Sequence, residues 1–66
     1  MAYNEIEQKI VSTFMNLVND GFPAKDAVLT LDYWIFVKYA HEFDKLNEEE
    51  QMDVRRVLHS LKLVHI

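Results

Sequence analysis

The sequence predicts an all-α protein, built as one small three-helix domain over residues 1–66. A chain of 66 residues has room for a single domain. It contains one Gly and one Pro, too few for an all-β fold, which needs a turn about every 8–12 residues. Half of the residues are hydrophobic and 27% are charged, a balance typical of globular rather than disordered chains. The apolar residues also recur at helical spacing.

The first helix is predicted over about residues 5–20. Asn4 is followed three residues later by Glu7, which is the pattern of a capping box. Gly21 supplies a left-handed stop after the helix, and Pro23 lies where the helix could not continue. The apolar residues with helical spacing are Ile6, Ile10, Phe14, Leu17 and Val18.

The middle helix is predicted over about residues 24–46, a stretch without Gly or Pro. A break near 30–32 is left open, because Thr30 or Asp32 could cap a fresh helix there. The segment 33–39 is rich in β-branched and aromatic residues, so a strand is the alternative. It does not alternate and has no hairpin signal beside it, which favours the helix.

The last helix is predicted over about residues 48–63. Asn47 can cap it, and the acidic residues of the range 48–50 suit the positive end of the helix dipole. The apolar tail 63–66 has no stop signal, so it either continues the helix or lies against the core.

The middle helix carries more apolar surface than two short neighbours can cover. One stripe consists of Val28, Leu31, Ile35, Tyr39 and Phe43, and a second of Leu29, Tyr33, Phe36, Val37 and Ala40, with Trp34 outside both. A helix that is apolar nearly all round is normally buried. We therefore expect a second copy of the chain to cover the remainder, since two-fold dimers are the commonest assembly, or else a different protein.

The predicted partner-binding residues follow from this excess. Tyr and Trp dominate the energetics of protein interfaces, so the aromatic segment is the expected anchor. The apolar candidates are Tyr33, Trp34, Phe36, Val37 and Tyr39. The polar alternative is a charged face of the last helix, which is otherwise an ordinary solvated face; its candidates are Glu48, Glu49, Arg55, Arg56 and Lys62.

Nucleic acid is disfavoured as a partner. The chain has seven basic and 11 acidic residues, a net charge of −4, whereas duplex-binding proteins of this size are usually basic. If the last helix served as a recognition helix, the positions at its start that would meet the base edges are Glu48, Glu49 and Glu50, which DNA repels.

No motif predicts catalysis, a metal site or a cofactor. The chain has no Cys, and His41, His59 and His65 show no metal-ligand spacing. One Gly does not make a phosphate-binding loop, and neither Ser12 nor Ser60 lies in a nucleophile-elbow motif. A site that pairs His41 with Glu42 or Tyr39 is the least favoured hypothesis.

Together these observations predict a small non-catalytic helical interaction protein, a regulator, inhibitor or adaptor that binds another protein as a homodimer. The first alternative is a nucleic-acid-binding transcriptional regulator that uses the basic face of the last helix. The second is an acidic nucleic-acid mimic that blocks a host protein. A chain of this length without an active-site motif is typical of small regulators, including those of phages and plasmids.

The compartment is predicted from the N-terminus and the apolar runs. The chain begins with Met and reads as a complete product, and its start lacks both the basic and the apolar region of a signal peptide. The longest strictly apolar run, 33–37, is far short of the roughly 20 residues that span a bilayer. We therefore expect a cytoplasmic protein without a membrane partner.

Overall fold

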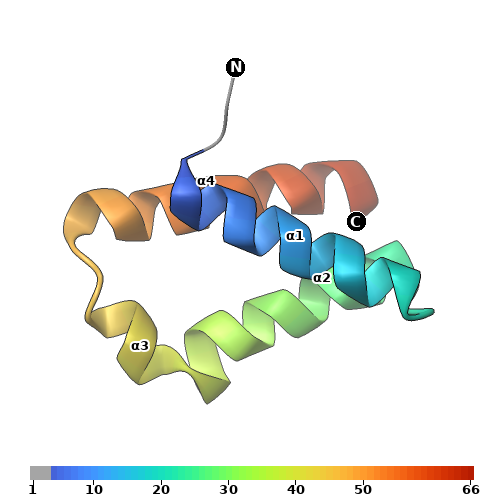
Figure 1. The fold of residues 1–66 in the computed structure, drawn as a ribbon, viewed down its shortest axis with the longest axis horizontal. Helices are drawn as coiled ribbons and strands as arrows, with labels where there is room; N and C mark the ends of the chain where they lie inside the picture. The colour runs from blue at the N-terminus through green and yellow to red at the C-terminus, as the bar shows by residue number, and fades with distance from the viewer. Residues whose placement is uncertain (1–3) are drawn as a thin grey trace.

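The computed structural model describes residues 4–66 and consists of helices joined by short connections (Figure 1). Residues 1–3, part of the N-terminal stretch considered above for a targeting signal, lie outside the described residues. The all-α class is confirmed, but the described chain has four α-helices rather than three, with a π-helical turn between the second and third. The elements are α1 (Glu5–Asn19), α2 (Ala24–Tyr33), η1 (Trp34–Lys38), α3 (Ala40–Asp44) and α4 (Glu48–His65).

The two longest helices begin where the sequence predicts, because each is capped by its own side chains. The Asn4 side chain accepts a hydrogen bond from the Glu7 backbone N–H, and the Glu7 carboxylate accepts one from the Asn4 N–H. Asn47 and Glu50 repeat the arrangement at the start of α4, at 2.8 and 3.1 Å. Each box satisfies N–H groups that have no partner inside the helix.

Gly21 lies in the turn between α1 and α2 with a φ of 108°, a backbone conformation that residues with a Cβ rarely adopt. The last helix extends to His65, two residues beyond the predicted end, so most of the apolar tail continues the helix.

No helix within residues 4–66 is both long enough and apolar enough to cross a membrane.

The predicted position of the break in the middle segment is wrong. Thr30 and Asp32 lie inside α2, and the chain instead changes direction at Tyr39, where φ is −114° and ψ is 33°. The turn that precedes this bend is π-helical: the Tyr39 N–H donates to the carbonyl oxygen of Trp34, five residues earlier, at 2.7 Å. Such a turn interrupts the regular hydrogen bonding of an α-helix. Asp32 stays helical while its carboxylate accepts from Lys62 of α4, a contact the local sequence does not reveal.

The core lies where α1, α2 and α4 pack together, with one residue added from α3. Its buried members are Ile10, Phe14, Leu17, Ala27, Val28, Leu31, Phe43, Val54, Val57 and Leu58. The first apolar stripe predicted for the middle segment is therefore buried at both of its ends. Val28 and Leu31 are buried at its start, and Phe43 is buried at its end.

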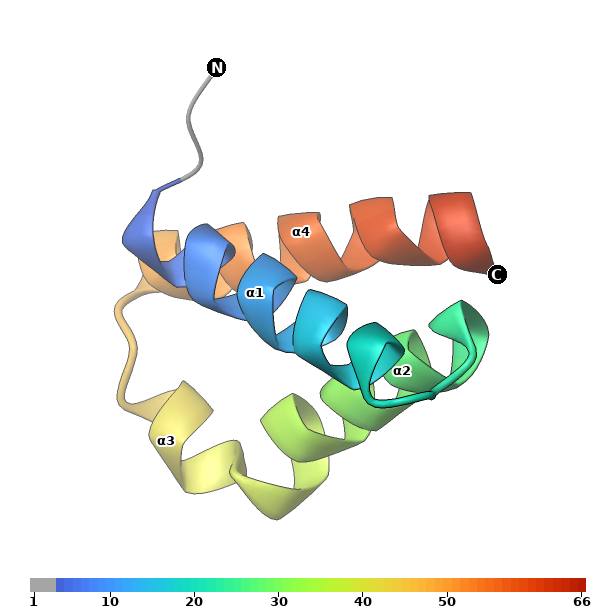
Figure 2. The same ribbon diagram turned by 45° about the vertical axis from the view of Figure 1, so that its right-hand side comes forward.

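The segment formed by α2 and η1 diverges from α4 along its length (Figures 1 and 2). The short helix α3 and the connection to α4 bridge the wide end, and the aromatic rings of Phe36 and Phe43 meet there with centroids 5.0 Å apart. The side-chain amide of Gln51 donates to the carbonyl oxygens of Phe43 and Leu46 at 3.3 and 3.1 Å, which ties the end of α3 to α4.

Candidate functional site: two grooves and an exposed stripe

A groove with an apolar lining opens between α1 on one side and the α2–η1–α3 segment on the other. Its volume is about 390 Å³, within the range of small binding sites. Its floor and walls are Ile6, Lys9, Ile10, Thr13, Leu31, Trp34, Ile35, Tyr39, Glu42, Phe43, Leu46 and Val54. We call this the apolar groove.

Lys9 from α1 and Glu42 from α3 supply opposite charges among the lining residues of the apolar groove. Glu42 forms an exposed ion pair with Lys45 at 3.8 Å, while Lys9 has no ion pair within residues 4–66. The Thr13 hydroxyl donates to the Lys9 backbone carbonyl, so it is occupied within α1. The groove therefore presents apolar surface with Lys9 as its uncompensated charge.

A second apolar feature is a row of three exposed side chains on α2 and η1. Leu29, Tyr33 and Val37 follow one another at a spacing of four residues and are 47, 54 and 62% exposed. That spacing keeps them on one side of the helical segment. We call these three residues the outer stripe.

A second groove, of about 520 Å³, lies between the α2–η1 segment and α4. Its lining combines charged, polar and apolar side chains: Asp32, Phe36, Met52, Arg55, Arg56, Leu58, His59 and Lys62. It shares no lining residue with the apolar groove, because consecutive residues of α2 and η1 point to different sides. We call it the basic groove.

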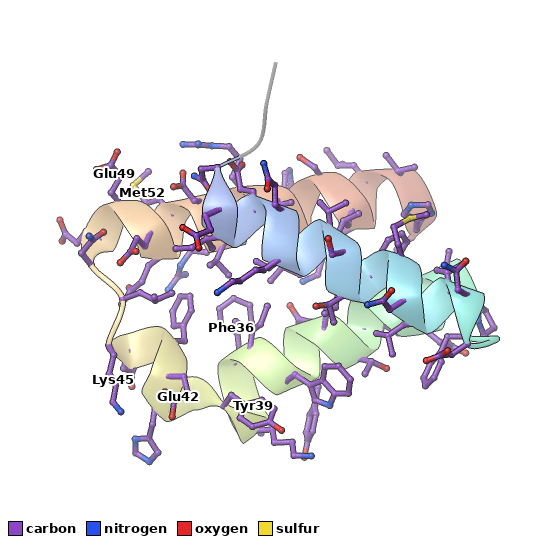
Figure 3. The ribbon with its side chains drawn as sticks, viewed as in Figure 1. Phe36, Tyr39, Glu42, Lys45, Glu49 and Met52 are labelled. Atoms are coloured by element: carbon purple, nitrogen blue, oxygen red, sulfur yellow. The ribbon has the colours of Figure 1, made fainter. Side chains whose placement is uncertain are left out.

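Aromatic rings hold the central cation of the basic groove. The guanidinium carbon of Arg55 lies 5.5 Å from the ring centroid of Phe43 and 5.9 Å from that of Phe36. Figure 3 shows Phe36 in the space between η1 and α4. Within residues 4–66 no carboxylate pairs with Arg55, which is an exposed residue.

The neighbouring cations of this groove are already paired. Lys62 donates to Asp32 at 2.8 Å across the groove, and Arg56 donates to Asp53 at 3.2 Å along α4. Asp53 also accepts from the Asn4 side chain at 2.7 Å, which links the start of α1 to α4.

The acidic candidates lie apart from both cavities. Glu48 and Glu49 are exposed in the first turn of α4, and neither lines a groove. Figure 3 shows Glu49 projecting from the side of α4 turned away from α3. Their position is the one that the helix dipole favours for carboxylates.

The five apolar candidates do not form one surface. Trp34 and Tyr39 line the apolar groove, Phe36 lines the basic groove, and Tyr33 and Val37 belong to the outer stripe. Sequence reasoning missed the residues that α1 and α3 add to these surfaces, among them Lys9 and Phe43. The sequence identifies Ile6 and Ile10 as apolar positions of the first helix. No feature of the neighbouring sequence indicates that these two side chains also border a groove.

Within residues 4–66 the structure gathers no set of three or more His, Asp or Glu side chains that could hold a metal ion. His65 packs against Phe14 with ring centroids 4.9 Å apart, and His59 lines the basic groove. His41 is exposed on α3.

Comparison with known proteins finds no matching family model, no matching curated protein and no matching solved structure. The function therefore has to be argued from the surfaces themselves.

Proposed function

We propose that this chain is a non-catalytic helical interaction protein that binds another protein, and that it does so as a homodimer. The observation that carries the first part is the apolar groove. It leaves apolar side chains of α1, α2 and η1 around an open volume of about 390 Å³, with Trp34 and Tyr39 among them. Aromatic side chains around a desolvated pocket are the usual anchors of a protein interface.

The outer stripe supports the homodimer. Large exposed apolar side chains that lie together typically mark an interaction site on a soluble protein. Leu29, Tyr33 and Val37 are such a set, and they face away from the core that α1, α2 and α4 form. In the proposal, a second copy covers this stripe about a two-fold axis, which leaves the apolar groove free for a different protein.

The groove is tested by comparing which proteins bind to the immobilised chain. The variants are Trp34→Ala and Lys9→Glu, and Lys25→Glu is the matched charge change on the exposed start of α2. We expect a protein that is retained by the wild type and by Lys25→Glu but lost with both groove variants. For the purified partner, Trp34→Ala should weaken binding by roughly 30-fold or more, as a hot-spot residue does.

The groove proposal is wrong if the wild type and both groove variants retain the same proteins, or if the wild type retains none. Far-UV circular dichroism of each variant, compared with the wild type, separates a lost interface from a lost fold. Lys9→Glu is the safer variant, because Lys9 is exposed and outside the core.

The dimer is tested by the mass in solution from light scattering. We expect twice the chain mass for the wild type and a single chain mass for Val37→Asp. Val64→Asp is the matched control, since Val64 is an exposed valine on the last helix, at 75% against 62% for Val37. A monomeric wild type, or a Val37→Asp variant that remains a dimer, contradicts the proposal.

The nucleic-acid alternative has less support. Of its three candidate cations, Arg56 and Lys62 are engaged by Asp53 and Asp32, so only Arg55 is uncompensated. The acidic-mimic alternative rests on the acidic residues Asp44, Glu48, Glu49, Glu50 and Asp53. The helix dipole already explains the three glutamates in the first turn of α4, and Asp53 is engaged by Arg56 and Asn4.

A further inference from the structure

The basic groove is distinct in chemistry from the rest of the molecule. The chain as a whole carries a net charge of −4. Among the lining residues of this groove, three are cationic and one is anionic: Arg55, Arg56, Lys62 and Asp32. Asp32 pairs with Lys62, and Asp53 pairs with Arg56, so Arg55 is the cation of this lining that remains unpaired, which favours a ligand of opposite charge at that place.

Arg55 is the side chain of this cavity that is best placed to bind an anionic ligand. Two aromatic rings lie within 6 Å of its guanidinium and restrict it, while no carboxylate of residues 4–66 occupies its N–H donors. An Arg held in this way loses less side-chain entropy on binding and can present its planar fork to a carboxylate.

The apolar members of the groove indicate what should accompany that carboxylate. Met52 is exposed on α4, and Phe36 is exposed at one edge while the other part of its ring packs on Phe43. Met52 and Phe36 both line this cavity, and a flexible Met together with an aromatic ring offers an adaptable surface to aliphatic side chains. A small inorganic anion would leave this apolar surface uncovered.

We propose that the basic groove is a second binding site, which takes an acidic segment of a protein that carries aliphatic residues beside its carboxylates. One carboxylate binds the guanidinium of Arg55, and a neighbouring aliphatic side chain covers Met52 and Phe36. This inference rests on the proposed function in one respect, that the natural ligand is part of a protein. It does not depend on the apolar groove, because the two cavities share no lining residue.

An acidic segment fits this groove better than a nucleic acid does. A nucleic-acid strand presents phosphates along an extended track and would pass the carboxylates of α4's first turn. Beyond the paired Arg56 and Lys62, the groove offers a single uncompensated cation, which matches a local contact with one or two carboxylates.

The test uses the pentapeptide amide N-acetyl-Glu-Leu-Glu-Leu-Glu and its neutral analogue, in which Gln replaces each Glu. Each is titrated into the isotopically labelled full chain and followed by two-dimensional NMR. We expect the acidic peptide to shift the Arg55 Nε–H and Met52 methyl signals. The neutral analogue should bind about tenfold more weakly, as should the acidic peptide to Arg55→Gln, because the charge-assisted hydrogen bonds are absent.

Lys25→Gln is the matched control, because it removes one exposed cation outside the groove and should change the affinity less than twofold. Met52→Gln is a second groove variant that keeps every charge, and it should weaken binding about threefold. Each variant must retain the wild-type backbone spectrum away from its substitution.

The proposal is overturned if the acidic peptide produces no shifts at Arg55 and Met52, or if Arg55→Gln binds it as well as the wild type does. It is also overturned if a 20-base-pair duplex binds more tightly than the peptide at the same ionic strength. Failure of the pull-down with Trp34→Ala and Lys9→Glu would remove the apolar-groove function alone and would leave these peptide measurements unchanged.

Discussion

The side-chain amide of Gln51, in the second turn of α4, donates to the backbone carbonyl of Phe43 in α3 at 3.3 Å and also to that of Leu46. The Phe43 carbonyl also accepts from the Leu46 N–H at 3.1 Å, so the Gln51 amide adds a second hydrogen bond to it from the following helix. Gln51 thus ties the short α3 and the connection after it to α4.

Gln51→Ala should therefore destabilise the protein. Two side-chain hydrogen bonds are lost at a half-buried position, at about 1 kcal/mol each, so the free energy of unfolding should fall by about 1–2 kcal/mol. Urea unfolding followed by circular dichroism measures this. The exposed substitution Ser60→Ala should stay within about 0.5 kcal/mol of the wild type. If the two variants are equally stable, Gln51 does not hold α3.

The Asn47 cap gives a second prediction. Asn47→Ala removes the side chain that accepts from the Glu50 N–H and should lower the free energy of unfolding by about 1 kcal/mol. Asn16→Ala is the same substitution on the exposed face inside α1, where Ala is the better helix former, so stability there should rise slightly. Thermal unfolding should therefore shift in opposite directions for the two variants.

The core is tested by a matched pair of leucines on the same helix. Leu58 is 2% exposed and Leu63 is 72% exposed. Leu58→Ala should cost about 2–5 kcal/mol, because a cavity remains where the side chain packed. Leu63→Ala should cost less than about 0.5 kcal/mol in the monomer. Comparable losses at both positions would mean that the end of α4 is covered in solution.

The ion pair between Asp32 and Lys62 is the remaining test of how α2 and α4 are joined. A double-mutant cycle with Asp32→Asn and Lys62→Gln should give a coupling energy of about 0.5–1 kcal/mol, because both side chains are partly exposed. Raising the salt concentration to 1 M should reduce it, since screening acts on exposed charges. A coupling of zero at low salt would show that the 2.8 Å contact adds no stability.

The starts of α1 and α4 and the end of α1 depend on local chemistry, and the sequence alone located them well. Asn4 and Asn47 cap their helices with Glu7 and Glu50, and Gly21 provides the left-handed stop. Each of these effects involves residues three or fewer positions apart or a single residue's conformational freedom, so it can be read without the rest of the molecule.

Tertiary structure decided where the middle segment bends and how its apolar residues are distributed. The bend at Tyr39 follows the π-helical turn and lies where the burial of Phe43 and its contact with Phe36 join α3 to the body, not where Thr30 or Asp32 could cap. The positions of α1 and α4 decide the surroundings of each aromatic or apolar side chain in this segment. They determine that Trp34 lines a groove, that Phe36 lies near Arg55 and that Val37 faces solvent. Burial of an apolar side chain is set by its spatial neighbours, whereas capping is set by its sequence neighbours.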